Sequence, residues 1–295
     1  MIPAATAMPM ASHLPPALLV AEQQQRNRRA WLLQVVLVTG VLALAGLLLG
    51  VVLALLAGGG AAAVGVGLGA GLAAAVLFTN LVPGLGEQVA LARAGARPSD
   101  PGRHPRLHNL TAGLCEQAGL PVPRLYVVDV DAANAFAVGR DPARSAVVVT
   151  RGLLEALNRV ELEGVVAHEL AHVDSHGARL ASATVVLGGL PGLLRERGGG
   201  LRPAAAALLA PLAARLLRLG APPRRLLDAD QSAAYLTRYP PGLIGALRKV
   251  TAAAGPLPGR PGLDHLWLVA PEPPLPGALP THPPLEERLD ALREM

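Results

Sequence analysis

Three side chains of the right types for metal chemistry stand close together in the sequence: His168, Glu169 and His172. On a helix, residues four apart share a face and are separated by about 6 Å along the axis, so both imidazoles can reach one tetrahedral zinc ion. Glu169 lies about 100° further round the helix, where its carboxylate can take a proton from a zinc-bound water. The spacing therefore predicts one zinc ion per chain, with His168 and His172 as ligands and Glu169 as the general base of a hydrolase.

The neighbours of this motif are those of a buried helix. Within residues 165–173 the positions around the three polar side chains are all valine, leucine or alanine. A metal-binding helix inside a folded domain needs such neighbours. The alternative is an amphipathic helix that presents two histidines to solvent, and a motif this short also arises by chance.

The composition indicates a membrane protein. Hydrophobic residues make up 52% and charged residues 16% of the 295 residues, which is more apolar than soluble domains usually are. The net charge of +5 comes from arginines scattered along a chain with only 2% aromatic residues, so no nucleic-acid partner is expected. Cys115 is the only cysteine, which excludes an intrachain disulfide.

A long uncharged run near the N-terminus predicts the membrane anchor. No charged residue occurs from Ala30 to Gly86, and a membrane-spanning helix needs about 20 apolar residues. We expect a disordered cytoplasmic tail over 1–30 and a transmembrane hairpin over 31–86, with the turn at residues 58–60. Arginines flank both ends of the hairpin and the turn has none. The positive-inside rule then predicts a multi-pass protein of the cell membrane, with everything after residue 87 facing the cytoplasm.

The rest of the chain, 87–295, predicts an α-rich α+β domain. Helices are expected at 107–120, 153–158, 161–175 and from 285 onwards, and strands at 124–130 and 146–150. A second apolar region, 180–219, interrupts this domain directly after the motif helix. Its uncharged runs are short for a membrane span, so we expect membrane contact there and two to four membrane segments in all.

Several ordered blocks of the sequence resemble the HtpX-type membrane metallopeptidases, which are relatives of the CAAX prenyl proteases. The blocks are 134–140, 147–154, 162–169, 232–249 and 281–288. The resemblance covers about residues 31–295 and implies a zincin-like fold, protein or peptide substrates, and a role in protein quality control at the lipid bilayer. It also makes His168 and His172 the zinc ligands and Glu169 the general base.

The resemblance assigns expectations to two further residues. Asn134 lies in the segment that resembles the family's substrate-binding edge, where an extended peptide could add as a strand. His282 matches a family histidine near the cleft that could stabilise an oxyanion. The simpler alternatives are a turn-forming polar residue at 134 and a loop histidine at 282.

The chain departs from the family pattern at the third zinc ligand. In the family, that ligand is a glutamate four residues before an aspartate. When the family aspartate is aligned with Asp230, the position of the glutamate is occupied by Leu226. Asp230 itself matches the family aspartate that holds a zinc-bound histidine. We name Asp228 as the tentative third ligand, and Asp230 or His176 as alternatives.

A second departure adds to this one. Residues 175–177 read Ser-His-Gly where the family usually has Asn-Arg-Asp. If no third ligand exists, the chain is a catalytically inactive relative that binds unfolded segments or partners through the same cleft.

Overall fold

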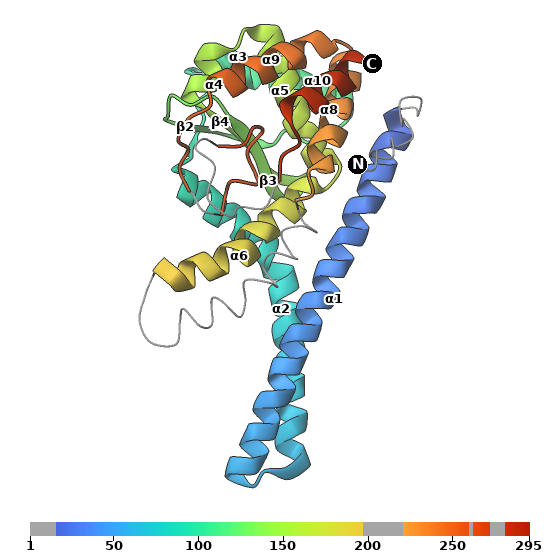
Figure 1. The fold of residues 1–295 in the computed structure, drawn as a ribbon, viewed down its shortest axis with the longest axis vertical. Helices are drawn as coiled ribbons and strands as arrows, with labels where there is room; N and C mark the ends of the chain where they lie inside the picture. The colour runs from blue at the N-terminus through green and yellow to red at the C-terminus, as the bar shows by residue number, and fades with distance from the viewer. Residues whose placement is uncertain (1–15, 197–220, 260–261, 272–280) are drawn as a thin grey trace, which may run out of the picture.

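The computed structural model describes residues 16–196, 221–259, 262–271 and 281–295. It consists of a long helical hairpin and a globular, mostly helical domain with one small sheet at the open end of the hairpin (Figure 1).

The hairpin consists of α1 (Pro16–Ala57) and α2 (Gly60–Ala94). Both are long and apolar enough to cross a membrane, and only 11% and 17% of their most apolar windows are buried, which distinguishes them from core helices. The two helices approach closely at glycines, because a Cβ on Gly46 would meet the Gly67 carbonyl and one on Gly67 would meet the Gly46 carbonyl. Small residues allow this contact between membrane helices.

The start of α1 differs from the sequence prediction. A disordered tail was predicted over 1–30, but α1 begins at Pro16, so residues 16–30 are helical; residues 1–15 lie outside the described part. Gln23 donates hydrogen bonds to the Asp228 carbonyl and to Ser232 Oγ, and Gln24 donates to the Asp174 carbonyl. These contacts with the globular domain stabilise a helix that a Pro- and Gln-rich composition does not predict.

The sheet has four strands in the order β1-β2-β4-β3. Their bounds are β1 (Arg97–Pro98), β2 (Arg124–Val128), β3 (Ala135–Asp141) and β4 (Arg144–Thr150). β2 and β4 are the strands predicted at 124–130 and 146–150, and they pair in parallel. β3 lies at the edge of the sheet and pairs antiparallel with β4. β3 was not predicted, because its first five residues are all buried and show no alternation of apolar and polar side chains.

Seven further helices are described: α3 (Pro105–Ala118), α4 (Arg151–Ala156), α5 (Arg159–Asp174), α6 (Gly177–Glu196), α8 (Arg224–Thr237), α9 (Pro240–Ala252) and α10 (Leu285–Arg293). The predicted helices at 107–120, 153–158, 161–175 and from 285 are confirmed as α3, α4, α5 and α10. The α-rich domain with a small sheet is confirmed as well.

α5 is the central element of the domain. Asn158 begins it with a capping box, in which its side chain accepts from the backbone of Glu161 while the Glu161 carboxylate accepts from the backbone of Asn158. From Leu162 to Val173 every residue except Glu163 is buried. Helices α8, α9 and α3 and strand β3 pack around it, so most of the α5 surface is covered.

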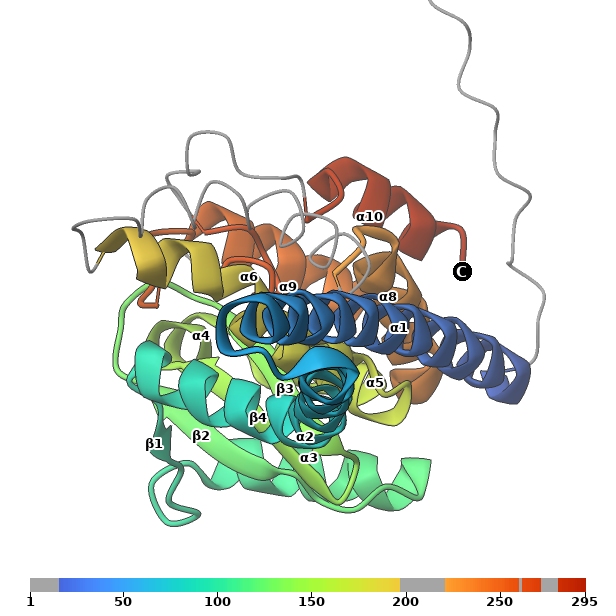
Figure 2. The same ribbon diagram turned by 90° about the horizontal axis from the view of Figure 1, so that it is seen from below.

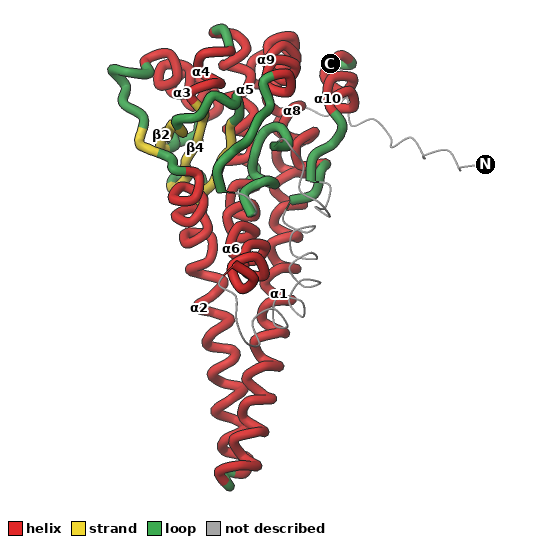
Figure 3. Tube along the Cα trace, turned by 60° about the vertical axis from the view of Figure 1, so that its left-hand side comes forward, coloured by secondary structure: helices red, strands yellow, loops and turns green. Residues whose placement is uncertain are grey.

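The region predicted as an apolar insertion, 180–219, begins inside α6. α6 leaves the globular domain and crosses the hairpin just below it (Figure 3). The helices α2 and α6 touch at their backbones, since a Cβ on Gly86 would meet the Ser182 carbonyl. Residues 197–220 lie outside the described part, and among the described helices only α1 and α2 qualify as membrane spans.

Candidate metal centre

The two histidines of α5 converge as the spacing predicts. The ring centroids of His168 and His172 are 4.8 Å apart with the planes at 89°, and the rings are 0% and 4% exposed. Nε2 of each ring has no hydrogen-bond partner. Buried polar atoms without a partner are rare in folded proteins. Two such nitrogens side by side therefore fit the open ligand positions of a divalent cation.

Burial keeps both rings in the form that binds metal. It lowers the pKa of His168 and, together with the charge of Arg225, lowers the pKa of His172 well below its usual value. The rings are therefore neutral at physiological pH, and a neutral imidazole nitrogen is the form that donates a lone pair to a metal.

A buried ion pair lies behind the neutral ring of His168 and orients it. Its Nδ1 lies 2.8 Å from Asp230 Oδ1, and both side chains are fully buried. Arg288 donates a hydrogen bond to each oxygen of the same carboxylate, from Nε to Oδ2 at 2.7 Å and from Nη2 to Oδ1 at 2.8 Å. A carboxylate behind a ligand histidine fixes its ring and tautomer. Asp230 thus takes the position expected of a residue that holds a ligand, not that of a ligand.

Glu169 is buried beside the pair without any hydrogen-bond partner at either carboxylate oxygen. Burial raises its pKa to about 8, against the opposing attraction of Arg225 and Arg288. A nearby divalent cation would lower that value again, because it favours the charged form. A carboxylate with a free oxygen next to two free imidazole nitrogens can hold and release a proton there.

The structure does not bring Asp228 to the histidines. Its carboxylate faces the first helix, where Arg26 Nη2 lies 2.7 Å from Oδ2, and Arg224 Nε lies 3.7 Å from Oδ1. His176 is exposed beyond the end of α5, at a φ of 60°. Among the described residues, no three His, Cys, Asp or Glu side chains gather as a metal-binding group. The tentative assignment of Asp228 as third ligand therefore has no support in this geometry and stays a prediction.

Leu226 occupies the place where the family pattern has its third ligand. It lies one turn before Asp230 on α8, so both face the same way toward α5. The side chain is 1% exposed, yet it belongs to neither of the two apolar clusters of the core. The described residues thus supply two ligands and leave an apolar side chain at the third position.

The comparisons with known proteins agree with this geometry. The model of peptidase family M48 matches residues 101–295. The chain belongs to peptidase family M48. Curated relatives carry the name Protease HtpX homolog. The one from Dictyoglomus turgidum is 39% identical over 241 residues, 75% of this chain and 79% of that protein. The one from Acaryochloris marina is 36% identical over 85% of this chain and 91% of that protein. The resemblance to HtpX-type peptidases is thereby confirmed.

In this M48 peptidase, Asn134 has a structural role that the resemblance did not suggest. It is 1% exposed, and its Nδ2 donates to the Val269 carbonyl at 2.8 Å. Its Oδ1 accepts from the backbone N–H groups of Ala135 and Val269. The side chain links the start of β3 to the segment around Val269.

His282 is likewise occupied. Its Nε2 lies 2.8 Å from the Trp267 carbonyl, to which it donates, and Nδ1 lies 3.0 Å from Thr281 Oγ1. Burial lowers the pKa of His282 to about 4, so the ring is neutral. With both ring nitrogens engaged, His282 offers no donor to a reacting oxygen in this conformation.

The segment 263–269, here called the covering segment, lies along the outer edge of β3. Leu268 N–H donates to the Ala135 carbonyl, and Arg288 Nη1 donates to the Leu268 carbonyl. Trp267 is fully buried and meets Phe136 of β3 edge-on at 4.7 Å. A peptide adding to this end of β3 must first displace the covering segment.

Two buried arginines were not predicted from the sequence. Arg288 lies in the resembling block 281–288, but arginines usually stay at the surface, so its link to Asp230 was not foreseen. Arg225 is also buried; it donates to the His265 carbonyl, its Nε has no partner, and its charge acts on Glu169. The helical period could have indicated that Arg225 is buried, because residues 225, 229 and 233 lie on one buried face of α8.

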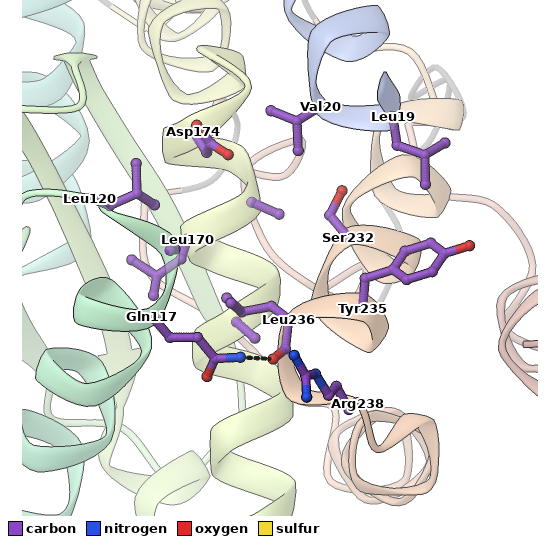
Figure 4. Close-up of a pocket in the computed structure, with 13 residues that line it drawn as sticks. Leu19, Val20, Gln117, Leu120, Leu170, Asp174, Ser232, Tyr235, Leu236 and Arg238 are labelled. Carbon is purple, nitrogen blue, oxygen red and sulfur yellow. Dashed lines mark hydrogen bonds between the residues drawn. The ribbon is translucent and has the colours of Figure 1, made fainter. Parts of the chain in front are cut away.

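A separate groove of about 750 Å³ lies on another side of α5 (Figure 4). Ala167, Leu170 and Ala171 of α5 line it, together with Tyr235 of α8 and Leu19 of α1. None of the three motif residues is part of its wall. The groove is therefore distinct from the candidate metal centre.

Proposed function

We propose that this M48 protein is a membrane-anchored, zinc-dependent endopeptidase. One zinc ion per chain would be held by His168 and His172, and Glu169 would be the general base. The observation that carries the proposal is the pair of buried, unpartnered Nε2 atoms beside an unpartnered carboxylate on one helix. A zincin-like arrangement of α5 against the sheet fits the same assignment.

Each residue of the site has a separate role in the proposed hydrolysis. When bound, zinc supplies an acidified water and polarises the substrate carbonyl. Glu169 accepts a proton from the attacking water and delivers it to the leaving amine. Asp230 and Arg288 hold the His168 ring in place. The apolar walls of α5 exclude bulk water, which strengthens each charge interaction within the site.

The anchor and its flanking charges suggest where substrates come from. The positive-inside rule supports a protein of the cell membrane whose peptidase domain faces the cytoplasm, with α1 and α2 in the lipid bilayer. Protein or peptide substrates would enter as an extended strand along β3, after release of the covering segment. Damaged membrane or cytoplasmic proteins are the substrates that the HtpX resemblance suggests, in a quality-control role.

A direct test combines metal analysis with proteolysis. The full chain, purified in detergent, is expected to hold about one zinc ion and to cleave casein. Removal of the metal by a chelator should stop cleavage, and added zinc should restore it. Metal-free protein that never cleaves after zinc addition would contradict the proposal and favour the inactive, segment-binding relative.

Replacing Leu226 with glutamate is expected to complete the site. A carboxylate one turn before Asp230 would face the two histidines and add a charged ligand. Zinc affinity should rise by at least about 10–100-fold. Residues that only orient a zinc ligand already change the affinity by that factor, and a direct ligand should change it no less. Competition with a coloured chelator measures it. Leu226→Gln is the matched control, since it has the same length without the charge; an equal affinity in both variants would show that position 226 does not face the metal.

A further inference from the structure

A basic cavity, separate from the groove of Figure 4, lies between the first part of α1 and the start of α6. Its volume is about 480 Å³. α1 contributes Gln24, Arg28 and Trp31, which share one face at helical spacing, and the α6 end contributes His176 and Arg179. Figure 2 shows α6 beside α1 in the view along the hairpin. This cavity is separate from the metal centre and from the groove of Figure 4.

Arg28 and Arg179 give the cavity its positive charge. Neither Arg28 nor Arg179 forms an ion pair within the described chain, and none of the lining residues is acidic. The Nε atom of Arg179 is buried without a hydrogen-bond partner. Arg26 is different, because it points away and pairs with Glu22 and Asp228.

Among the described residues, two carboxyl groups act on the side chains of the cavity: Asp174 on His176 and Asp141 on Arg179. Asp174 is the last residue of α5 and Asp141 pairs with Arg144, and neither forms an ion pair with Arg28 or Arg179 within the described residues. Both arginines therefore lack a carboxylate partner in the described part of the chain and can bind an anion.

With α1 and α2 in the bilayer, as proposed above, the cavity lies at the height of the membrane surface. The uncharged run of the hairpin starts at Ala30, directly after Arg28 and Arg29. Trp31 is therefore at the level where tryptophan is enriched in membrane proteins, between headgroups and hydrocarbon. The Arg179 guanidinium lies 4.1 Å from the centre of the Trp31 ring, a cation–π contact that fixes its position.

The start of α6 adds to the attraction for an anion. Its first turn reaches the cavity through Arg179 and Leu180. The N-terminal end of a 20-residue helix carries partial positive charge. Basic pockets beside membrane helices on the cytoplasmic side suit phosphate-bearing headgroups.

We propose that this cavity binds the phosphate of an anionic phospholipid headgroup. Arg28 and Arg179 contact the phosphate, Gln24 donates from its amide, and Trp31 packs against the glycerol and upper acyl region. The bound lipid bridges α1 and α6, so it fastens the membrane hairpin to the helix that follows the metal-binding helix.

The test measures retained lipid on the full chain. The protein is purified in neutral detergent, mixed with phosphatidylglycerol or phosphatidylcholine, and analysed by native mass spectrometry. Wild type is expected to retain one phosphatidylglycerol at least tenfold more often than phosphatidylcholine. Arg179→Gln and Arg28→Gln should each lower this retention about five- to tenfold, in line with the loss of one charge-assisted hydrogen bond.

Arg29→Gln is the matched control, because Arg29 has the same charge at the same membrane level but does not line the cavity. It should leave retention near that of wild type. An equal loss in Arg29→Gln would overturn the proposal, since it would mean attraction to the basic segment as a whole. Displacement of the lipid by millimolar inorganic phosphate would do the same, because the site would then bind free phosphate. Zinc content and casein cleavage play no part in this readout, so its outcome is independent of the proposed peptidase activity.

Discussion

Glu169→Gln is expected to reduce peptide hydrolysis about 10²- to 10⁴-fold, the usual contribution of a general base. Glutamine has the same size but cannot take a proton from water. The Glu169 carboxylate makes no hydrogen bond in the fold, so its loss removes no structural contact. Zinc content should therefore stay at the wild-type level while cleavage disappears.

The measurement compares casein cleavage, zinc per chain and melting temperature in one set of preparations. Glu163→Gln serves as the control, because Glu163 lies on the same helix but is its one residue between 162 and 173 that is not buried. That variant should cleave at the wild-type rate. Unchanged cleavage in Glu169→Gln would rule out its role as the base, whatever the zinc content.

Asp230→Asn should give the largest loss of stability among single substitutions in the domain. It leaves the guanidinium of Arg288, which is 2% exposed, without its charge partner. Breaking a buried ion pair from one side costs about 3–5 kcal/mol. The same change frees the His168 ring, and zinc affinity should fall about 10–100-fold.

Thermal unfolding and chelator competition separate these two effects. Adding Arg288→Met to Asp230→Asn removes the stranded charge, so stability should recover in part while zinc affinity stays low. Asp290→Asn is the surface control: its pair with Arg293 is exposed, and its cost should stay below about 1 kcal/mol. A single Asp230→Asn variant as stable as the Asp290→Asn control would contradict the buried-pair account.

The pH dependence of this pair has a definite sign. Burial alone would raise the pKa of Asp230, but Arg288 and His168 hold it below its usual value. A carboxyl whose pKa is lower in the folded state stabilises the fold above its unfolded pKa, near 3.9. This contribution is therefore complete at neutral pH and is lost only as the pH falls through the folded value.

Features that depend on local sequence could be predicted. An uncharged run from Ala30 to Gly86 leaves few structures other than apolar helices, and the spacing of 168 and 172 determines that the imidazoles share a face. The strands β2 and β4 follow from short β-branched runs between turn residues. These patterns need no knowledge of what packs against them.

Features that depend on distant partners could not be predicted. Asp228 looked like a ligand because its true partner, Arg26, is about 200 residues earlier in a segment predicted to be disordered. Asn134 was assigned to a substrate-binding edge by the family resemblance alone, and nothing local in the sequence indicates its bonds with Val269. The buried arginines belong to the same class, because a charge enters the core only where a distant residue compensates it.

The beginning of α1 changes what counts as the catalytic unit. Gln24 Nε2 donates to the Asp174 carbonyl and Asn27 Nδ2 to the Ser175 carbonyl, the free acceptors at the C-terminal end of the helix that carries the histidines. A water-soluble fragment that starts after the hairpin would lack both donors, and its histidine helix would fray from that end. The same two hydrogen bonds join α1 to the last turn of α5, so we expect a change in the tilt of α1 to shift the backbone two residues from His172.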